Sequence, residues 1–151
     1  MKKILITCSV IAALITASCK KSDNAIAKEQ TNFLTTGSWK NVSTEWQTTG
    51  GAWVPPPTWA SATYPSVLTF LETYTYTSNL GAAGTWQYST DKKQIILMRN
   101  AVSFTATIEV LNGSALQLSR PMDPNTTYTT QTVNGSTTYT YYNKERTNFT
   151  H

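Results

Sequence analysis

The feature that most constrains this chain is a series of short β-branched and aromatic runs, which begins near Gly37 and is divided by turn signals. In the clearest run, from Ser103 to Val110, apolar and polar residues alternate without interruption. Such alternation is typical of a β-strand with one buried and one solvated face. No amphipathic helical pattern of useful length follows Gly37. The sequence therefore predicts a single all-β domain over residues 37–151.

Two Asn-Gly pairs mark hairpins in this series, because Asn-Gly between alternating segments is a strong hairpin signal. The first separates 103–110 from 115–119, and the second separates 127–133 from 137–142. The other predicted strands cover residues 38–47, 66–71, 73–78, 85–89 and 94–99. About eight or nine strands without crossover helices indicate a sandwich or an up-and-down antiparallel barrel. We favour the barrel, because closure leaves no strand edge unpaired.

The first residues have the order of a secretory signal. Lys2 and Lys3 precede an apolar run from Ile4 to Ala17, which ends in small residues. A membrane-spanning helix needs about 20 apolar residues, and this run is shorter. We therefore predict that residues 1–18 are a cleavable signal peptide.

The positions of the two cysteines indicate how the exported chain is attached to the membrane. Cys8 lies inside the predicted signal, so Cys19 would remain without a disulfide partner. Ala17-Ser18-Cys19 resembles the lipobox of bacterial lipoproteins, although Thr16 stands where an aliphatic residue is usual. The resemblance implies that Cys19 is acylated and anchors the protein in a membrane, and Lys20 in place of Asp favours the outer membrane. An ordinary secretory signal with a chance cysteine is the alternative.

The polar segment that follows is expected to be a tether. Residues 19–36 would comprise the acylated cysteine and a flexible spacer, in which residues 25–30 form at most a short helix. From Gly37 onward the chain has seven basic and six acidic residues, so the net charge of +4 belongs mainly to the signal and the tether. A nearly neutral domain has no basic footprint for nucleic acid. Nucleic acid is therefore not a predicted partner, whereas a membrane is predicted as a partner through acylated Cys19.

A family resemblance begins at Gly37-Ser38-Trp39 and continues through Thr73–Tyr76, Gly84-Thr85-Trp86 and Ile95-Ile96-Leu97. In their order, these elements resemble the small lipocalin-like lipoproteins of Gram-negative bacteria. The resemblance implies a barrel of about eight strands, the usual size of a small ligand-holding barrel. It also implies that Trp39 closes the barrel floor and packs against an arginine near the last strand.

Two arginines compete for this place beside Trp39. Arg146 fits by its order in the chain, and Arg120 is the rival.

The segment from Gly50 to Trp59 is long for a hairpin loop and contains three consecutive prolines. A polyproline run holds its neighbours in an extended, low-entropy frame. The resemblance implies that this first loop forms a lid, so Trp53 and Trp59 are predicted to line or cover a pocket. The alternative is that both tryptophans cap the barrel end as plugs.

Tyrosines recur at alternate positions, so that Tyr74 and Tyr76 share one sheet face, as do Tyr139 and Tyr141. Such pairs line a cavity or form cross-strand ladders outside it. The candidate ligand-binding residues are Trp53, Trp59, Tyr74, Tyr76, Trp86 and Phe104.

Catalysis finds little support in the sequence. The one histidine is His151, and there is no Gly-x-Ser-x-Gly motif or Gly-rich phosphate loop. Glu45, Glu72 and Glu109 fall on different predicted strands, whereas a glycosidase needs two carboxylates about 5 to 10 Å apart. No calcium-loop spacing is present either. We predict no catalysis, no cofactor and no metal.

The sequence thus favours a lipid-anchored envelope protein that binds a small apolar or amphipathic ligand in or at the mouth of the barrel. A solid barrel that acts as a structural or protein-interaction module is the alternative, because small barrels also occur with filled interiors.

Overall fold

The computed structural model describes residues 23–61 and 64–151, so Cys19 and the predicted signal peptide lie outside the described residues. The described part contains two helices, α1 (Asp23–Thr35) and α2 (Thr58–Ser61). Its strands are β1 (Ser38–Thr48), β2 (Trp53–Val54), β3 (Val67–Phe70), β4 (Thr75–Ser78), β5 (Ala83–Tyr88), β6 (Gln94–Arg99), β7 (Val102–Leu111), β8 (Ala115–Pro121), β9 (Tyr128–Val133) and β10 (Ser136–Thr150). No helix in these ranges has the length and apolar character needed to cross a membrane.

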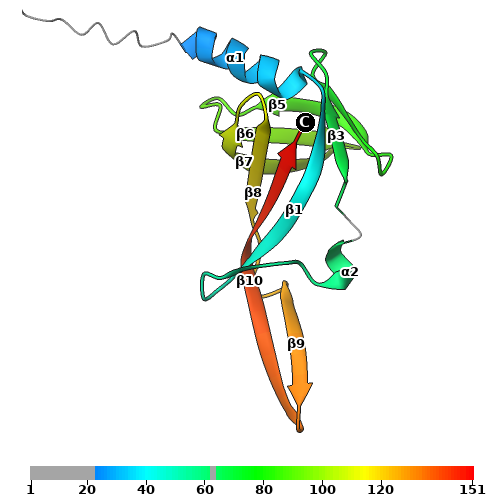
Figure 1. The fold of residues 1–151 in the computed structure, drawn as a ribbon, viewed down its shortest axis with the longest axis vertical. Helices are drawn as coiled ribbons and strands as arrows, with labels where there is room; N and C mark the ends of the chain where they lie inside the picture. The colour runs from blue at the N-terminus through cyan, green and yellow to red at the C-terminus, as the bar shows by residue number, and fades with distance from the viewer. Residues whose placement is uncertain (1–22, 62–63) are drawn as a thin grey trace, which may run out of the picture.

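Eight of these strands close into an antiparallel barrel. They pair in the order β1-β3-β4-β5-β6-β7-β8-β10, and β10 pairs with β1 to complete the ring. The strand β2 adds to the far half of β1, and β9 pairs with the first half of β10 (Figure 1). The predicted antiparallel barrel is therefore confirmed.

The last strand serves two parts of the molecule. Over residues 144–150, β10 pairs with both β1 and β8 and closes the barrel, whereas residues 136–141 pair with β9 alone among the described strands. The strand predicted from the sequence ends at Tyr142, whereas β10 continues to Thr150. The charged run Lys144-Glu145-Arg146 obscures the alternation beyond Tyr142. The alternation continues nonetheless, since Glu145, Thr147 and Phe149 are all buried.

The helix α1 lies across one end of the barrel, beside the C-terminus (Figure 1). Leu34 and Trp39 are completely buried there, and the Trp39 Nε1 donates a hydrogen bond of 2.9 Å to the Leu34 carbonyl oxygen. The flexible tether predicted for residues 19–36 is thus wrong over Asp23–Thr35. A helix of this length is marginal by itself, and burial of Leu34 contributes about 1.5 to 3 kcal/mol to its stability.

The interior next to α1 is filled with side chains. Trp39, Phe70, Trp86, Ile95 and Leu116 are among the fully buried residues. The rings of Phe70 and Trp86 meet edge to face at 5.9 Å between centroids, a favourable arrangement for two aromatic side chains. This packing makes the α1 side the closed end of the barrel.

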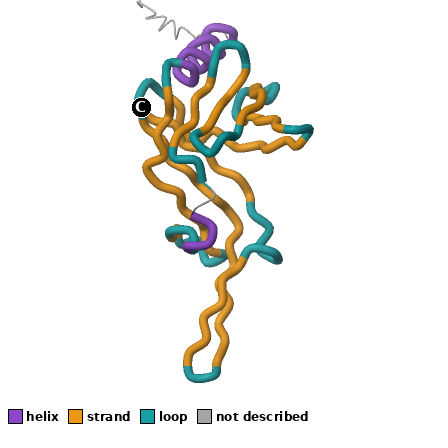
Figure 2. The backbone as a smooth tube through the Cα atoms, turned by 90° about the vertical axis from the view of Figure 1, so that its right-hand side faces the viewer, coloured by secondary structure: helices purple, strands orange, loops and turns teal. Residues whose placement is uncertain are grey.

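Beyond the other end, the far half of β1 and the first half of β10 continue away from the barrel. Trp46, Ala60 and Tyr142 form a second, smaller core there, which α2 and β2 cover. Further out, β9 and residues 136–141 of β10 project as a two-stranded hairpin, here called the arm (Figure 2). The molecule is therefore a barrel with a closed end, an open end and an arm beyond the open end.

Candidate binding cavity

The open half of the barrel encloses a cavity of about 600 Å³. Small-molecule sites typically occupy roughly 300 to 1,000 Å³. Buried side chains from six different strands form the apolar part of the wall: Leu68, Tyr76, Leu97, Ala106, Leu118 and Phe149. The barrel is thus filled at its closed end and hollow at its open end.

The cavity wall changes from apolar to charged toward the mouth. On β6, Leu97 lines the cavity and is followed by Arg99 on the same face. On β8, Leu118 is likewise followed by Arg120. Because side chains alternate between the two faces of a strand, every second residue of these strands points inward. Two arginines therefore face the mouth above an apolar interior.

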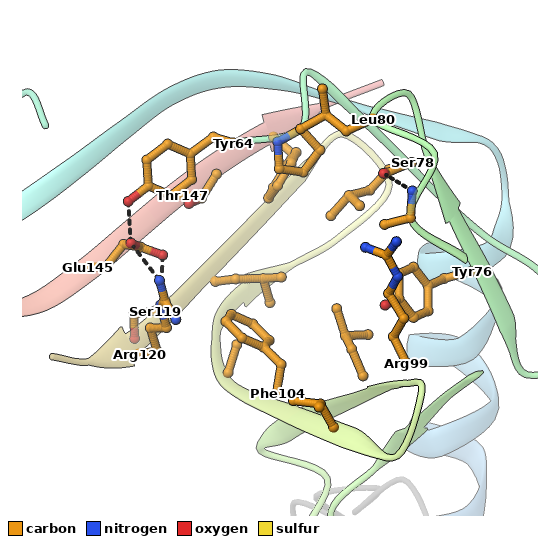
Figure 3. Close-up of a pocket in the computed structure, with 18 of the residues that line it drawn as sticks. Tyr64, Tyr76, Ser78, Leu80, Arg99, Phe104, Ser119, Arg120, Glu145 and Thr147 are labelled. Atoms are coloured by element: carbon orange, nitrogen blue, oxygen red, sulfur yellow. Dashed lines mark hydrogen bonds and ion pairs between the residues drawn. The ribbon is translucent and has the colours of Figure 1, made fainter. Parts of the chain in front are cut away.

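A hydrogen-bonded network occupies one side of the mouth (Figure 3). The carboxylate of Glu145, which is 5% exposed, accepts bonds from Arg120 Nε at 2.9 Å and from Arg120 Nη2 at 3.1 Å. The Tyr64 hydroxyl also donates to Glu145, and the Trp46 Nε1 donates to the Tyr64 oxygen at 2.7 Å. A buried carboxylate is stable only when its charge is paired and its oxygens are bonded, and Glu145 meets both conditions.

The Tyr64 hydroxyl keeps its proton in this network. Burial raises its pKa well above the usual range, and the hydrogen bond to Glu145 and the negative charge of Glu145 raise it further. Tyr64 therefore remains a donor to Glu145 at physiological pH.

Arg99 lies on the other side of the cavity, near Tyr76 and Ser78 (Figure 3). Its side chain is exposed toward the cavity mouth, and it takes part in none of the ion pairs formed by the described residues. The guanidinium of Arg120, in contrast, is paired with Glu145 and lies over the Phe104 ring at 4.9 Å.

Of the candidate ligand-binding residues, Tyr76 and Phe104 line the cavity. Trp86 is buried in the closed end, where its Nε1 donates to the Leu71 carbonyl oxygen at 3.0 Å. Tyr74 lies outside the cavity wall, with its ring 5.1 Å from that of Trp86. Alternation alone cannot distinguish these residues. It gives the face of a strand but not the height of Trp86 along the barrel, and Tyr74 lies in the turn before β4, with a φ of 60°.

The two loop tryptophans are not among the described residues that line the cavity. The ring of Trp53 lies under the Arg146 guanidinium at 4.1 Å, and Trp59 is 65% exposed with its ring edge against Trp46. The prediction that these tryptophans cover the pocket is therefore corrected. Tyr64 and Pro65, at the end of the same connection, reach the mouth instead, and no sequence motif distinguishes them.

The structure also gives Trp39 other partners than the predicted arginine. Its ring packs on that of His151, with 3.8 Å between centroids. Arg146 pairs with Glu45, with 2.7 Å between Nη2 and Oε2, and Arg120 pairs with Glu145. Arg146 faces away from the interior because its neighbour Glu145 faces inward.

The acidic residues do not form a catalytic pair at the cavity. Among the described lining residues, Glu145 is the one carboxylate. Glu109 instead accepts hydrogen bonds from Ser119 and from Lys144, which hold its pKa below the usual value. No group of three or more potential metal ligands occurs in the described part of the chain.

The chain matches no known protein-family model and no curated protein.

Proposed function

We propose that this protein is a lipid-anchored, lipocalin-like protein of the cell envelope that binds one small apolar or amphipathic molecule without catalysis. The observation that carries this proposal is the cavity of about 600 Å³ in the open half of the barrel, whose buried lining is mostly apolar. Small barrels either fill their interior or hold one ligand. This interior is filled only near α1, so the open half has room for a ligand.

Exposed apolar side chains at the rim of the cavity favour the entry of an apolar ligand. Leu80 and Val102, at the ends of neighbouring hairpins, line the cavity and expose 53% and 70% of their surface. Each methylene group that moves from water into the cavity gains about 0.8 kcal/mol. An apolar chain therefore has a continuous favourable path from the rim to the buried wall.

Filling the cavity tests this function. Ala106 is buried in the cavity wall, so we expect Ala106→Phe to occupy ligand space and to abolish binding. Ala83 is exposed and lies outside the wall, so Ala83→Phe is the matched control and should bind normally. Native mass spectrometry of the full-length chain with Cys19→Ser, after exposure to envelope lipid extract, measures the bound mass, and circular dichroism verifies folding.

A reproducible bound mass in the parent and in Ala83→Phe, lost in Ala106→Phe, supports the proposal. Absence of any bound mass in the parent contradicts it.

A second candidate function, an interaction module of the envelope, is supported by the arm. Tyr128, Tyr139 and Tyr141 are exposed on one face of the arm and pack on one another, with centroids 5.7 to 6.1 Å apart. The chain has no charged residue from Pro124 to Asn143. An exposed, uncharged aromatic surface of this kind is characteristic of a contact site.

A further inference from the structure

The mouth of the cavity carries one positive charge that no described residue neutralises. Ile95 and Leu97 are buried, and the alternation of β6 places Arg99 on the same inner face, one step closer to the mouth. Arg99 lines the cavity but forms no ion pair with a described carboxylate. Its charge is therefore available to a ligand.

The rest of the mouth does not cancel this charge. Arg120 and Glu145 compensate each other, and both carboxylate oxygens of Glu145 already accept hydrogen bonds from Arg120. Tyr64 is uncharged, because its raised pKa keeps the hydroxyl protonated. The described lining residues thus leave a net charge of about +1, and an uncompensated cation at the entrance attracts anions.

The backbone fixes Arg99 at the entrance. Arg99 pairs with Val102 across the turn that joins β6 to β7. The two turn residues, Asn100 and Ala101, have φ angles of 48° and 63°. Positive φ at both central residues is the requirement of the type I′ turn, one of the two common two-residue hairpin turns. The anchor point of the arginine is therefore rigid, although its side chain remains accessible.

Further hydrogen-bond donors lie close to Arg99. Ser78 lines the cavity, and its oxygen accepts a bond of 3.2 Å from the Ala82 amide, which leaves the hydroxyl hydrogen available to a ligand. Asn100 also lines the cavity and adds a side-chain amide. A guanidinium, a hydroxyl and an amide match the acceptor oxygens of a carboxylate or phosphate.

From this arrangement we infer that Arg99 binds the anionic head group of a single-chain amphipathic ligand, while the chain of that ligand occupies the apolar cavity. The inference rests on the proposed function and specifies its ligand class. A carboxylate and a phosphate head group share the chemistry that the arginine recognises. A cationic amphipath is disfavoured, because Glu145 is already paired and Arg99 repels it.

Four probes with the same dodecyl chain test the inference by calorimetric titration: dodecanoate, dodecyl phosphate, dodecanol and dodecyltrimethylammonium. The protein is the full-length chain with Cys19→Ser, compared with the same chain carrying Arg99→Gln. Lys93→Gln is the matched control, since Lys93 is an exposed cation outside the cavity wall.

We expect the parent to prefer the anions, and Arg99→Gln to bind them about tenfold more weakly with dodecanol affinity unchanged. Lys93→Gln should behave as the parent. Whichever anion loses more affinity in Arg99→Gln identifies the head group as carboxylate or phosphate.

Equal binding of dodecanol and both anions by the parent, or an equal loss for all probes in Arg99→Gln, would overturn the head-group site while leaving the carrier function intact. Failure of all four probes to bind the parent would overturn the carrier function itself.

Discussion

At the scale of single residues, two carboxylates with similar partners lie in different environments. Glu145 is 5% exposed and accepts hydrogen bonds from Arg120 and Tyr64. Tyr64 in turn accepts a hydrogen bond from Trp46. The side chain of Glu109 is 34% exposed and pairs with Lys144 at the surface. Exposed ion pairs contribute little to stability, whereas removal of one partner from a buried pair is costly.

We therefore expect Glu145→Gln to lower the free energy of unfolding by about 2 kcal/mol, because Arg120 then faces the cavity without its counter-charge. Glu109→Gln, the matched surface control, should lower it by less than about 1 kcal/mol. Urea unfolding followed by tryptophan fluorescence measures both changes. Equal losses in the two variants would contradict the difference in environment.

The sequence predicted which face of a strand points inward, but it did not predict which charged side chains form ion pairs. Alternation correctly placed the hydrophobic side of the strand around Ala106 toward the interior, where Ala106 is 2% exposed. It could not show that Arg146 pairs with Glu45, because the two residues are far apart in the chain and meet only when β10 closes on β1. The position of Arg99 at the cavity mouth was missed for a related reason. How far along the barrel a residue lies depends on the lengths of all the hairpins, which local sequence does not give.

At the scale of elements, β1 shows why a strand can be predicted and its geometry missed. Trp39 and Trp46 are both buried although an odd number of positions separates them. A register shift between Asn41 and Ser43, around the exposed Val42, turns the strand and makes this possible. The helix α1 was missed because it depends on burial of Leu34 against the barrel, a contact that local sequence does not reveal.

The arm is the strand pair with the least support from the rest of the molecule, and an isolated two-stranded hairpin is at best marginally stable in water. We expect amide hydrogens of 128–141 to exchange faster than those of 144–150, which pair with strands on both sides. Hydrogen exchange read by mass spectrometry measures this difference.

If the arm is a contact site, a photo-crosslinking residue at Tyr139 should capture one reproducible envelope partner in living cells, and the same residue at the exposed barrel position Gln87 should not. Equal capture at both positions would count against the interaction function.

At the scale of the whole molecule, the sequence connects the proposed anchor to α1, which lies across the closed end of the barrel. Cys19 precedes the start of α1 at Asp23 by four residues, and a chain of that length spans at most about 14 Å. An acylated Cys19 would thus hold the start of α1 close to the membrane. The fold class was predictable, because strand alternation and turn signals are local features of the sequence. Which end of the barrel is closed was not predictable, because it depends on where α1 packs.

The anchor itself is tested with the full chain in a Gram-negative host that is fed an alkyne-modified fatty acid. We expect the parent chain to be labelled and to sediment with membranes, since acyl chains provide stable anchoring. Cys19→Ser should lose both properties, and Cys8→Ser, which removes the other cysteine, should keep them. A label retained in Cys19→Ser would refute acylation at this position.

The continuity of β10 joins the arm directly to the wall of the barrel. One strand forms half of the arm and then a wall of the cavity, and the register irregularity between Tyr142 and Lys144 leaves Asn143 as the joint between the two parts. The arm is therefore attached at Asn143, two positions before Glu145, which lines the cavity. Its attachment point thus lies beside the open end of the barrel.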